Sequence, residues 1–279
     1  MVHTALSDVT LTMIVRDELM NPAGGLLPML EYHLPHFPET VVLDTGSVDG
    51  TRELLEHLLG QYPRLSVYDA DFKGFGAART TANSHVHSKY SLVLDADEMI
   101  SSIDGLAGDI EKANERYDRD EFALKFKFNW IHPFCGNFTR DYNVLNPRLF
   151  PKSKTIFEKV VYEGVTVTDQ KIRDNINFAS TPIHHFVPDG EGVEFKDKRY
   201  YNEMTVFNLD DSRGKAKEFL QQHGPPSSKE GFERWKTPNP RCLGEYGIDV
   251  FAVLRKLHDL GLKPHPKIIE RLVNCPREL

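Results

Sequence analysis

Residues Tyr90–Ile100, with the sequence YSLVLDADEMI, join a short apolar run to a group of acids. The run at 91–94 predicts a strand buried on both faces. Asp95, Asp97 and Glu98 follow at its carboxyl end, where open α/β sheets bind their ligands. Carboxylates this close repel one another unless a cation or solvent compensates, and Mg²⁺ and Mn²⁺ prefer oxygen ligands. The stretch therefore indicates either a metal-binding edge or a solvated acidic turn.

The composition is that of a soluble globular protein. The chain has 279 residues, 40% of them hydrophobic, enough for one large α/β domain or a domain with an appendage. A formal net charge of −7 argues against general binding to nucleic acid or anionic membranes. Three scattered cysteines form no disulfide framework, and we find neither a signal peptide nor a membrane-spanning run. We therefore expect a cytoplasmic protein.

Strand and helix patterns alternate through the first third of the chain. The predicted strands are Val9–Val15, Val41–Leu43, Leu65–Tyr68 and 91–94, and the predicted helices are Leu26–Leu34, Thr51–Leu59 and Phe75–His87. Such alternation with short connections predicts a mostly parallel, twisted, Rossmann-like sheet with helices on both faces.

Three of these strands end in acids: Asp17, Asp44 and the group that begins at Asp95. Because the carboxyl ends of parallel strands share one edge, a ligand crevice is expected there. Gly74-Phe75-Gly76 is no dinucleotide fingerprint, because it follows the third strand and lacks a third glycine. It reads as a helix N-terminus that can meet a phosphate, or as a turn. Arg79 points to the same end or is a surface arginine.

Beyond residue 117 the pattern changes to period two. Residues 122–130 alternate aromatic or aliphatic with small or polar side chains, which predicts a strand whose last residue, Trp130, packs in the core or stacks on a sugar. Tyr142–Phe150 and Ile156–Val167 are further predicted strands. Within the second, Glu158 and Glu163 would face opposite sides, so Glu163 can enter a site if Glu158 meets solvent.

The last third contains a histidine pair and a helical tail. His184 and His185 lie in a predicted strand, where an imidazole is either a hydrogen-bonded structural group or the ligand that completes an acid-based metal site. Residues 224–241 read as a loop. Helices are predicted at Lys196–Leu209, Arg213–His223, Ile248–Leu260 and Pro266–Val273.

Four motifs, LTMIVRDE, VVLDTGSVDGT, DFKGFGAART and SLVLDADE, occur in an order and spacing that resemble the inverting family 2 glycosyltransferases of the GT-A fold. The sequence is most similar to a bacterial-type branch with MIVKNE, VDTGSTDGT and LDADE. The resemblance covers about residues 9–205. It implies a catalytic domain at 1–205 and a C-terminal helical extension at 206–279, which would bind the acceptor, form an oligomer or close the core.

Three later segments carry the same resemblance. Pro147–Phe150 looks like the RLF motif of that branch. Phe157–Glu163 resembles FEG-x-VHE, with Lys for Gly and Tyr for His. Ile183–Phe186 resembles I-x-H-Y, although Val-Pro replaces the Gly-Tyr that usually follows.

The resemblance implies a role for each matching residue. Asp44 would lie near the base, Arg79 would contact the base or a phosphate, and Asp95 would lie near the ribose and metal. Asp97 and His185, or less favourably His184, would bind Mn²⁺ or Mg²⁺. Glu163 would be the general base, with Glu98 as its rival. The implied nucleotide pocket comprises Val15, Arg16, Glu18, Asp44, Phe72, Arg79, Asp95 and Ala96.

These residues fit an inverting transfer, which needs one base at the acceptor and electrophilic help for the departing diphosphate. The expected donor is a UDP-sugar and the acceptor a glycan or another hydroxyl. A sugar-1-phosphate nucleotidylyltransferase is the alternative enzyme. Residues 16–25 lack the Gly-rich loop with a basic residue that its chemistry needs after the first strand. An inactive nucleotide- or sugar-binding module is the third hypothesis.

Overall fold

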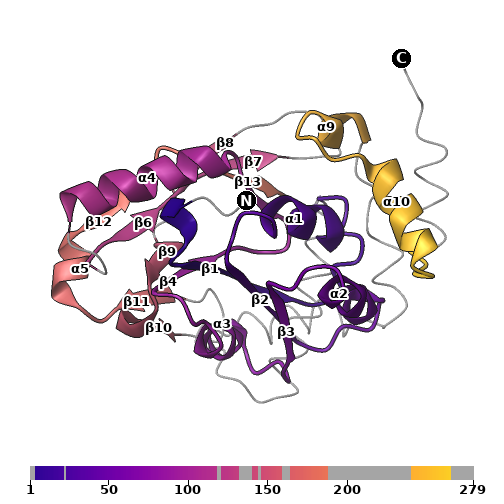
Figure 1. Ribbon diagram of the computed structural model, residues 1–279, viewed down its shortest axis with the longest axis horizontal. Helices are drawn as coiled ribbons and strands as arrows, with labels where there is room; N and C mark the ends of the chain where they lie inside the picture. Colours follow the sequence, from indigo (N-terminus) through magenta and orange to yellow (C-terminus); the bar gives the residue numbers. More distant parts are fainter. Residues whose placement is uncertain are drawn as a thin grey trace, which may run out of the picture.

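The computed structural model shows an α/β protein built on a seven-stranded mixed sheet (Figure 1). It describes residues 4–21, 23–117, 121–131, 140–143, 146–158, 164–187 and 240–264. In spatial order the strands are β12 (Ile176–Phe178), β6 (Ala123–Lys125), β9 (Leu149–Pro151), β4 (Tyr90–Val93), β1 (Val9–Val15), β2 (Glu39–Asp44) and β3 (Leu65–Asp69). The strands from β4 to β3 run parallel, and β9 is antiparallel to β4 and β6.

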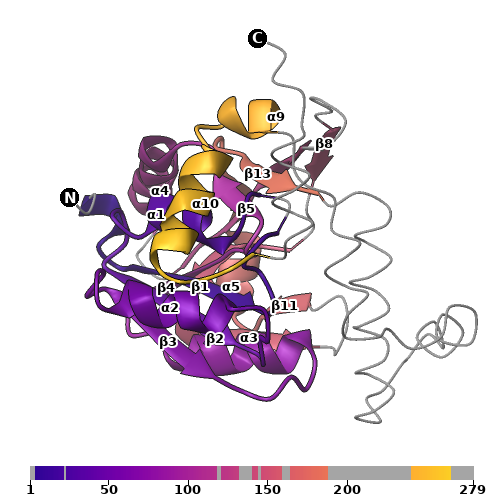
Figure 2. The same cartoon turned by 90° about the vertical axis from the view of Figure 1, so that its right-hand side faces the viewer.

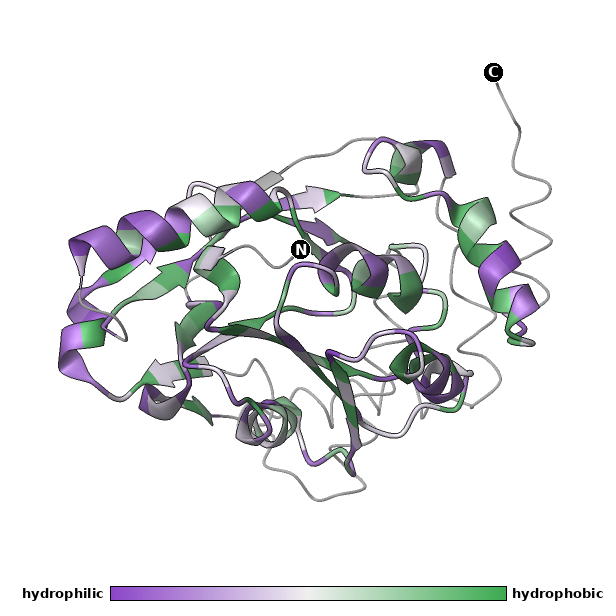
Figure 3. Cartoon of the chain, in the orientation of Figure 1, coloured by the Kyte–Doolittle hydropathy of each residue, from purple (hydrophilic) through white to green (hydrophobic). Residues whose placement is uncertain are grey.

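Helices cover both faces of this sheet, as predicted. The apolar residues of α3 (Phe75–Ser84) pack with Leu43 on one face. Those of α1 (Leu26–His33), α2 (Thr51–Leu59) and α4 (Ile103–Arg116) join the main core with Val42, which points the other way from β2. Figure 3 shows the result as largely hydrophobic strands beneath helices with a hydrophilic outer side.

A second, four-stranded sheet holds β5 (Glu98–Ile100), β13 (Ile183–Phe186), β7 (Lys127–Ile131) and β8 (Arg140–Asn143) in that order. The prediction of one strand over 122–130 is therefore wrong, because the chain leaves the large sheet after β6 and enters the small one at β7. Phe126 lies at the crossing, fully buried. A period-two pattern cannot show this change, since the alternation continues through it.

Two other predicted strands are also divided. Residues 142–150 contain the end of β8 and most of β9, which lie in different sheets. Residues 156–167 contain most of an antiparallel hairpin of β10 (Thr155–Glu158) and β11 (Gly164–Val167). The helix predicted to reach His87 ends at Ser84, where the His85 N–H turns back to the Ala82 carbonyl. The remaining described elements are η1 (Thr4–Leu6), η2 (Lys152–Lys154) and α5 (Gln170–Asp174).

The described part of the C-terminal region is α9 (Pro240–Gly244) and α10 (Val250–Asp259). The second confirms a predicted helix, whereas α9 begins inside the predicted loop. Both helices lie at the end of the molecule that carries β5 and β13 (Figure 2), and their apolar residues join the main core. The other predicted C-terminal helices and the predicted domain boundary at 205 lie outside the described residues. No helix in the described ranges is long and apolar enough to cross a membrane.

Candidate functional site

The acids predicted at the strand ends meet at one edge of the large sheet. Val15 lies opposite Asp44 in the β1–β2 register, and Thr12 lies opposite Val93 in the β1–β4 register. Val15 is buried, and its carbonyl accepts hydrogen bonds from the N–H and the hydroxyl of Thr45 at 3.0 and 3.1 Å. The ends of β1 and β2 are therefore fixed to each other beside the end of β4.

The loop after β1 is held by the loop after β2. Asp17 has a positive φ of 53°, a conformation that aspartate tolerates better than most residues. Its N–H donates to Ser47 Oγ at 3.0 Å, and its Oδ1 accepts from the Val48 N–H at 2.7 Å. The Glu18 N–H donates to Thr51 Oγ1 at 2.8 Å. Side chains and amides of the two loops thus shape this part of the edge together.

Asp44 combines burial with an unused acceptor. Its side chain is 2% exposed, and Oδ1 accepts from the N–H groups of Gly46 and Ser47 at 2.7 and 2.8 Å. Its Oδ2 is buried and accepts no hydrogen bond within the part of the chain that the structure describes. Buried acceptors usually have a partner, so this oxygen is suited to a donor group on a ligand.

Arg16 and Phe72, two further residues of the predicted pocket, lie near each other. The Arg16 guanidinium carbon is 6.0 Å from the centre of the Phe72 ring, which packs edge-on against Phe75 with centroids 5.2 Å apart. Glu18 is buried in the adjoining loop. Their contact with a nucleotide stays a prediction.

Hydrogen bonds to the backbone hold the acidic turn at 95–98 in place. The Glu98 N–H donates to the Asp95 carbonyl at 3.1 Å, and the Asp95 N–H donates to Glu98 Oε2 at 2.9 Å. The Asp97 carbonyl accepts from the Phe186 N–H at 2.9 Å, and the buried Ala96 offers its carbonyl to Asn21 Nδ2 at 2.8 Å. The carboxylates therefore project from a rigid turn.

Two arginines hold Asp95. Arg79 pairs with its Oδ1 and is itself 3% exposed, and Arg148 Nη2 lies 3.5 Å from its Oδ2. Burial acts to raise the pKa of Asp95, but Arg79, Arg148 and His185 outweigh it and lower that pKa. The direct contacts predicted for Arg79 with a base or phosphate, and for Asp95 with ribose and metal, stay predictions; the structure shows the two residues bound to each other.

Glu98 lies behind the turn, with no exposed side-chain surface. Its Oε1 accepts from Arg148 Nη2 at 2.7 Å. Burial raises the pKa of Glu98 to about 8, with Asp95 and Asp97 acting the same way, while Arg148 and the Asp95 N–H oppose the change. A carboxyl so enclosed is poorly placed to meet an acceptor hydroxyl, so the geometry disfavours Glu98 as the rival base.

The two histidines of β13 face opposite ways. His185 lies opposite Glu98 in the β5–β13 register, and its Nε2 is 3.8 Å from Asp97 Oδ1. The ring of His184 packs edge-on against Tyr246 instead, with centroids 5.1 Å apart. Of the two predicted ligands, His185 is the one brought to Asp97.

The Asp97–His185 pair fits a divalent cation of the predicted kind. A separation of 3.8 Å is within the span of two metal–ligand bonds of about 2.1 Å. The described residues contain no group of three His, Cys, Asp or Glu side chains that could hold a metal ion together. Mg²⁺ commonly takes only one or two protein carboxylates and completes its shell with water and substrate phosphates.

The structure adds two residues that had been given no role. Arg148 occurs in the sequence as part of the RLF-like motif, but its two acidic partners lie about fifty positions away and leave no local signal. Asn21 precedes Pro22 in a stretch that carries no recognisable site motif, and it is fully buried and reaches Ala96.

Glu163, the predicted base, lies outside the described residues. Glu158 ends β10 and accepts from Thr166 Oγ1 at 2.8 Å, on the exposed side of the hairpin. The argument that placed Glu163 opposite Glu158 assumed one continuous strand, which the hairpin replaces. The role of Glu163 therefore rests on the sequence resemblance alone.

A family model described as "Glycosyl transferase family 2" matches residues 34–121. This segment contains β2, β3, β4 and the acidic turn, and the match supports the predicted class of enzyme, a glycosyltransferase.

Solved structures give more distant likenesses, each covering 95% of this chain. TarS 1–349 of S. aureus is 17% identical over 88% of its chain, with a TM-score of 0.44. Its complex with UDP-GlcNAc is 16% identical over 89%, with a TM-score of 0.46. The mannosyltransferase PcManGT of Pyrobaculum calidifontis, in complex with GDP-Man and Mn²⁺, is 16% identical over 79%, with a TM-score of 0.47. Since these scores are below 0.5, the fold assignment rests on the strands and helices described above.

Proposed function

We propose that this protein is a metal-dependent inverting glycosyltransferase that moves a sugar from a UDP-sugar to an acceptor hydroxyl. The observation that carries the proposal is that Asp44 and the Asp97–His185 pair lie at one edge of the sheet. Asp44 and Asp97 belong to the segment matched by the family model, and His185 follows it in the sequence. One end of the edge offers a buried hydrogen-bond acceptor. The other offers a cation site.

Asp44 favours uracil over guanine as the base. Uracil presents a single N–H donor on its pairing edge, whereas guanine presents N1–H and N2–H₂ together. One oxygen of Asp44 already accepts two backbone N–H groups, so Oδ2 remains for one donor from the ligand. A guanine would need both oxygens for a bidentate contact. Uracil and thymine share this single N3–H, so Asp44 favours either of them over guanine, and the donor that we propose is the uridine nucleotide.

Asp97 and His185 are the residues that would hold Mn²⁺ or Mg²⁺. When bound, such an ion neutralises the charge that develops on the departing diphosphate. Arg148 and Arg79 pair with the Asp95 carboxylate next to this position, so we assign the ion to Asp97, the acid of the turn that faces His185. Glu163 is the proposed general base, which takes the proton from the acceptor hydroxyl as the oxygen attacks the anomeric carbon from the side opposite the diphosphate.

Nucleotide release tests the proposal. The protein is incubated with UDP-, GDP- and dTDP-sugars and Mn²⁺, with and without candidate hydroxyl acceptors, and free nucleotide is measured. We expect release from a UDP-sugar that falls by about 10²–10⁴-fold in Glu163→Gln, the range typical of general-base catalysis. Glu158→Gln is the matched control and should keep full activity. A thermal shift with a nucleotide but no nucleotide release would favour the inactive binding module, and the absence of both with every nucleotide would overturn the proposal.

A further inference from the structure

We propose that the C-terminal segment 240–264 positions the Asp95–Glu98 turn, with Asn21 as the residue that transmits its contact. This inference rests on the proposed function, because it concerns the aim of Asp97 toward a cation. The described C-terminal helices would then help to position the site, in addition to closing the core.

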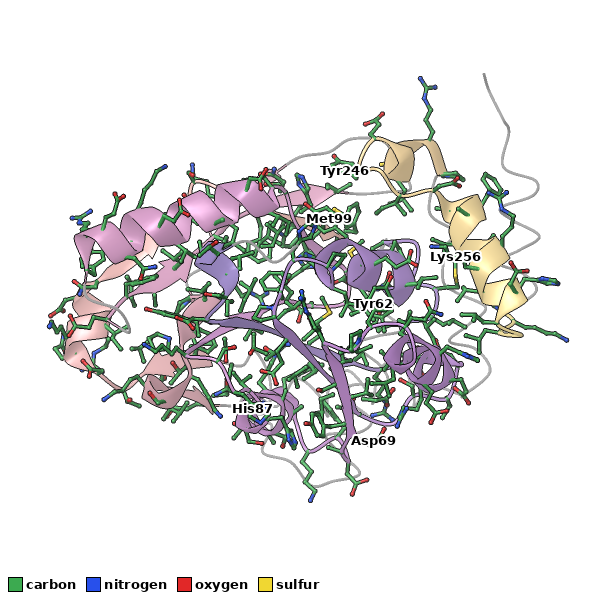
Figure 4. All side chains as sticks on the ribbon, viewed as in Figure 1. Tyr62, Asp69, His87, Met99, Tyr246 and Lys256 are labelled. Atoms are coloured by element: carbon green, nitrogen blue, oxygen red, sulfur yellow. The ribbon has the colours of Figure 1, made fainter. Side chains whose placement is uncertain are left out.

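The first contact joins the segment to the loop after β1. Gly24 has a φ of +83°, and a Cβ built on it would lie 3.2 Å from Ile248 Cγ2 and 3.4 Å from Leu243 Cδ1. The apolar side chains of the segment therefore sit directly on the backbone of this loop. Lys256 Nζ adds an ion pair from α10 to Glu31 Oε1 on α1 at 2.7 Å; Figure 4 labels Lys256 on that helix.

Asn21 connects the same loop to the turn. It is fully buried, and its Oδ1 accepts from the N–H groups of Ala23 and Gly25 at 3.0 and 3.1 Å. Its Nδ2 donates to the Ala96 carbonyl at 2.8 Å, across 75 positions of sequence. One side chain thus ties the loop under Ile248 to the peptide that precedes Asp97.

A second route reaches Asp97 from the other side. Tyr246 follows α9 and packs edge-on against Phe186, with ring centroids 5.4 Å apart. The Phe186 N–H donates to the Asp97 carbonyl at 2.9 Å. Tyr246 also contacts His184, the strand partner of Met99 in β5, and Figure 4 labels both Tyr246 and Met99. The peptide after Asp97 is supported by Phe186, which touches the segment, and the peptide before it by Asn21, whose loop touches the segment at Gly24.

This support matters for the proposed chemistry because the two peptide planes fix the direction of the Asp97 side chain. A displacement of about 1 Å in a reacting group can cost about 10²-fold in rate. Asn21 itself contacts backbone amides and a carbonyl, so we assign it a positioning role.

Asn21→Asp tests the hydrogen bond to Ala96 separately from the hydrogen bonds to Ala23 and Gly25. The carboxylate still accepts from Ala23 and Gly25, so the loop is retained, but the donor to Ala96 is replaced by a repelling oxygen. Asn175→Asp is the matched control, since Asn175 Nδ2 donates to the Glu121 carbonyl at 2.9 Å beside β12, at the far edge of the sheet. Tyr246→Leu tests the second route, with His258→Ala as its control on α10, because the His258 side chain is 87% exposed.

Two readouts are used on the full chain. The first is deuterium exchange of the peptide covering 94–100 without metal, which we expect to quicken at least about fivefold in Asn21→Asp and Tyr246→Leu only. The second is Mn²⁺ binding in the presence of UDP, followed by the paramagnetic resonance signal of the free ion. We expect about 10-fold weaker binding in the same two variants, while both controls bind as the wild type does.

The outcomes are separable. Unchanged exchange at 94–100 in a folded Asn21→Asp protein overturns the positioning role, whatever the metal does. Exchange at 94–100 that quickens equally in Asn21→Asp and in the control Asn175→Asp also overturns the positioning role, because the effect is then general destabilisation. If the wild-type chain binds no Mn²⁺ and releases no nucleotide, the proposed function fails, while the exchange result still decides the link from segment to turn. Should Asn21→Asp not fold, Tyr246→Leu decides by the same criteria.

Discussion

The loop after β2 and the turn after β4 flank the end of β1, but they hold their carboxylates by different means. Asp44 is held by two backbone N–H groups and keeps one oxygen without a partner among the described residues. Asp95 and Glu98 are held by arginines, and Asp97 faces a histidine. The first region suits a neutral donor, such as the base edge of the proposed nucleotide. The second is built around charge, as the proposed diphosphate and cation would require.

The largest expected effect is on the charged region. Asp97→Ala removes a proposed cation ligand and should lower kcat by about 10³–10⁴-fold, which corresponds to about 4–5 kcal/mol of transition-state stabilisation. The measurement is turnover at saturating donor and Mn²⁺. Asp69→Ala is the control, because Asp69 also ends a strand but is 62% exposed and pairs with Arg52. Activity of Asp97→Ala within tenfold of the wild type would remove the cation assignment.

Arg148→Met should give the next largest effect, on stability. Arg148→Met leaves the buried Glu98 Oε1 without its donor and Asp95 with one cation fewer, and each lost partner of a buried polar group typically costs about 1–3 kcal/mol. Urea unfolding measures the change. Arg52→Met, which breaks exposed pairs with Glu56 and Asp69, should cost less than about 1 kcal/mol. Equal losses in the two variants would show that the charged region is no more constrained than the surface.

A pH effect should follow from His33, which supports β5 directly after the turn. Its Nδ1 lies 2.7 Å from the Met29 carbonyl, its Nε2 accepts from the Ile100 N–H at 3.3 Å, and burial lowers its pKa from 6.5 to about 4. Between about pH 6.5 and pH 4, the unfolded chain therefore binds a proton on His33 that the folded chain does not bind. As the pH falls through this range, the free energy of unfolding should decrease by about 3 kcal/mol.

Denaturant unfolding at pH 4 to 7 tests this effect. The slope should be smaller in His33→Gln, and unchanged in His57→Gln, whose side chain is exposed on α2. The same slope in His33→Gln as in the wild type would mean that other groups cause the acid sensitivity.

The smallest effect is expected in the region held by backbone N–H groups. Asp44→Asn places an amide donor opposite the donor of the base, or loses the backbone contacts on rotation, and should raise KM for the UDP-sugar by about 30-fold, near 2 kcal/mol. The kcat should change little, because the reacting groups are untouched. Steady-state kinetics separate the two constants. A fall in kcat with an unchanged KM would contradict the division between the two regions.

Much of this arrangement was predictable from local patterns. Apolar runs and helical spacing are properties of a few neighbouring residues, so α1, α2, β1 and β3 appear within a residue of their predicted bounds. The acids at the strand ends were readable for the same reason, since a parallel sheet brings such ends to one edge. Residues 122–130 show the limit, because the alternation is the same in one strand as in two.

What the sequence by itself determined was the alternating α/β order, the edge at which the acids meet and the set of residues that can serve there. The tertiary structure decided which of them face one another. Neighbouring residues on a strand point to opposite faces, so only the pairing of β13 with β5 brings His185, and not His184, to Asp97. Arg148 and Asn21 gained their partners across about 50 and 75 positions. Such contacts depend on how distant segments pack, and that packing leaves no pattern in the residues around either side chain.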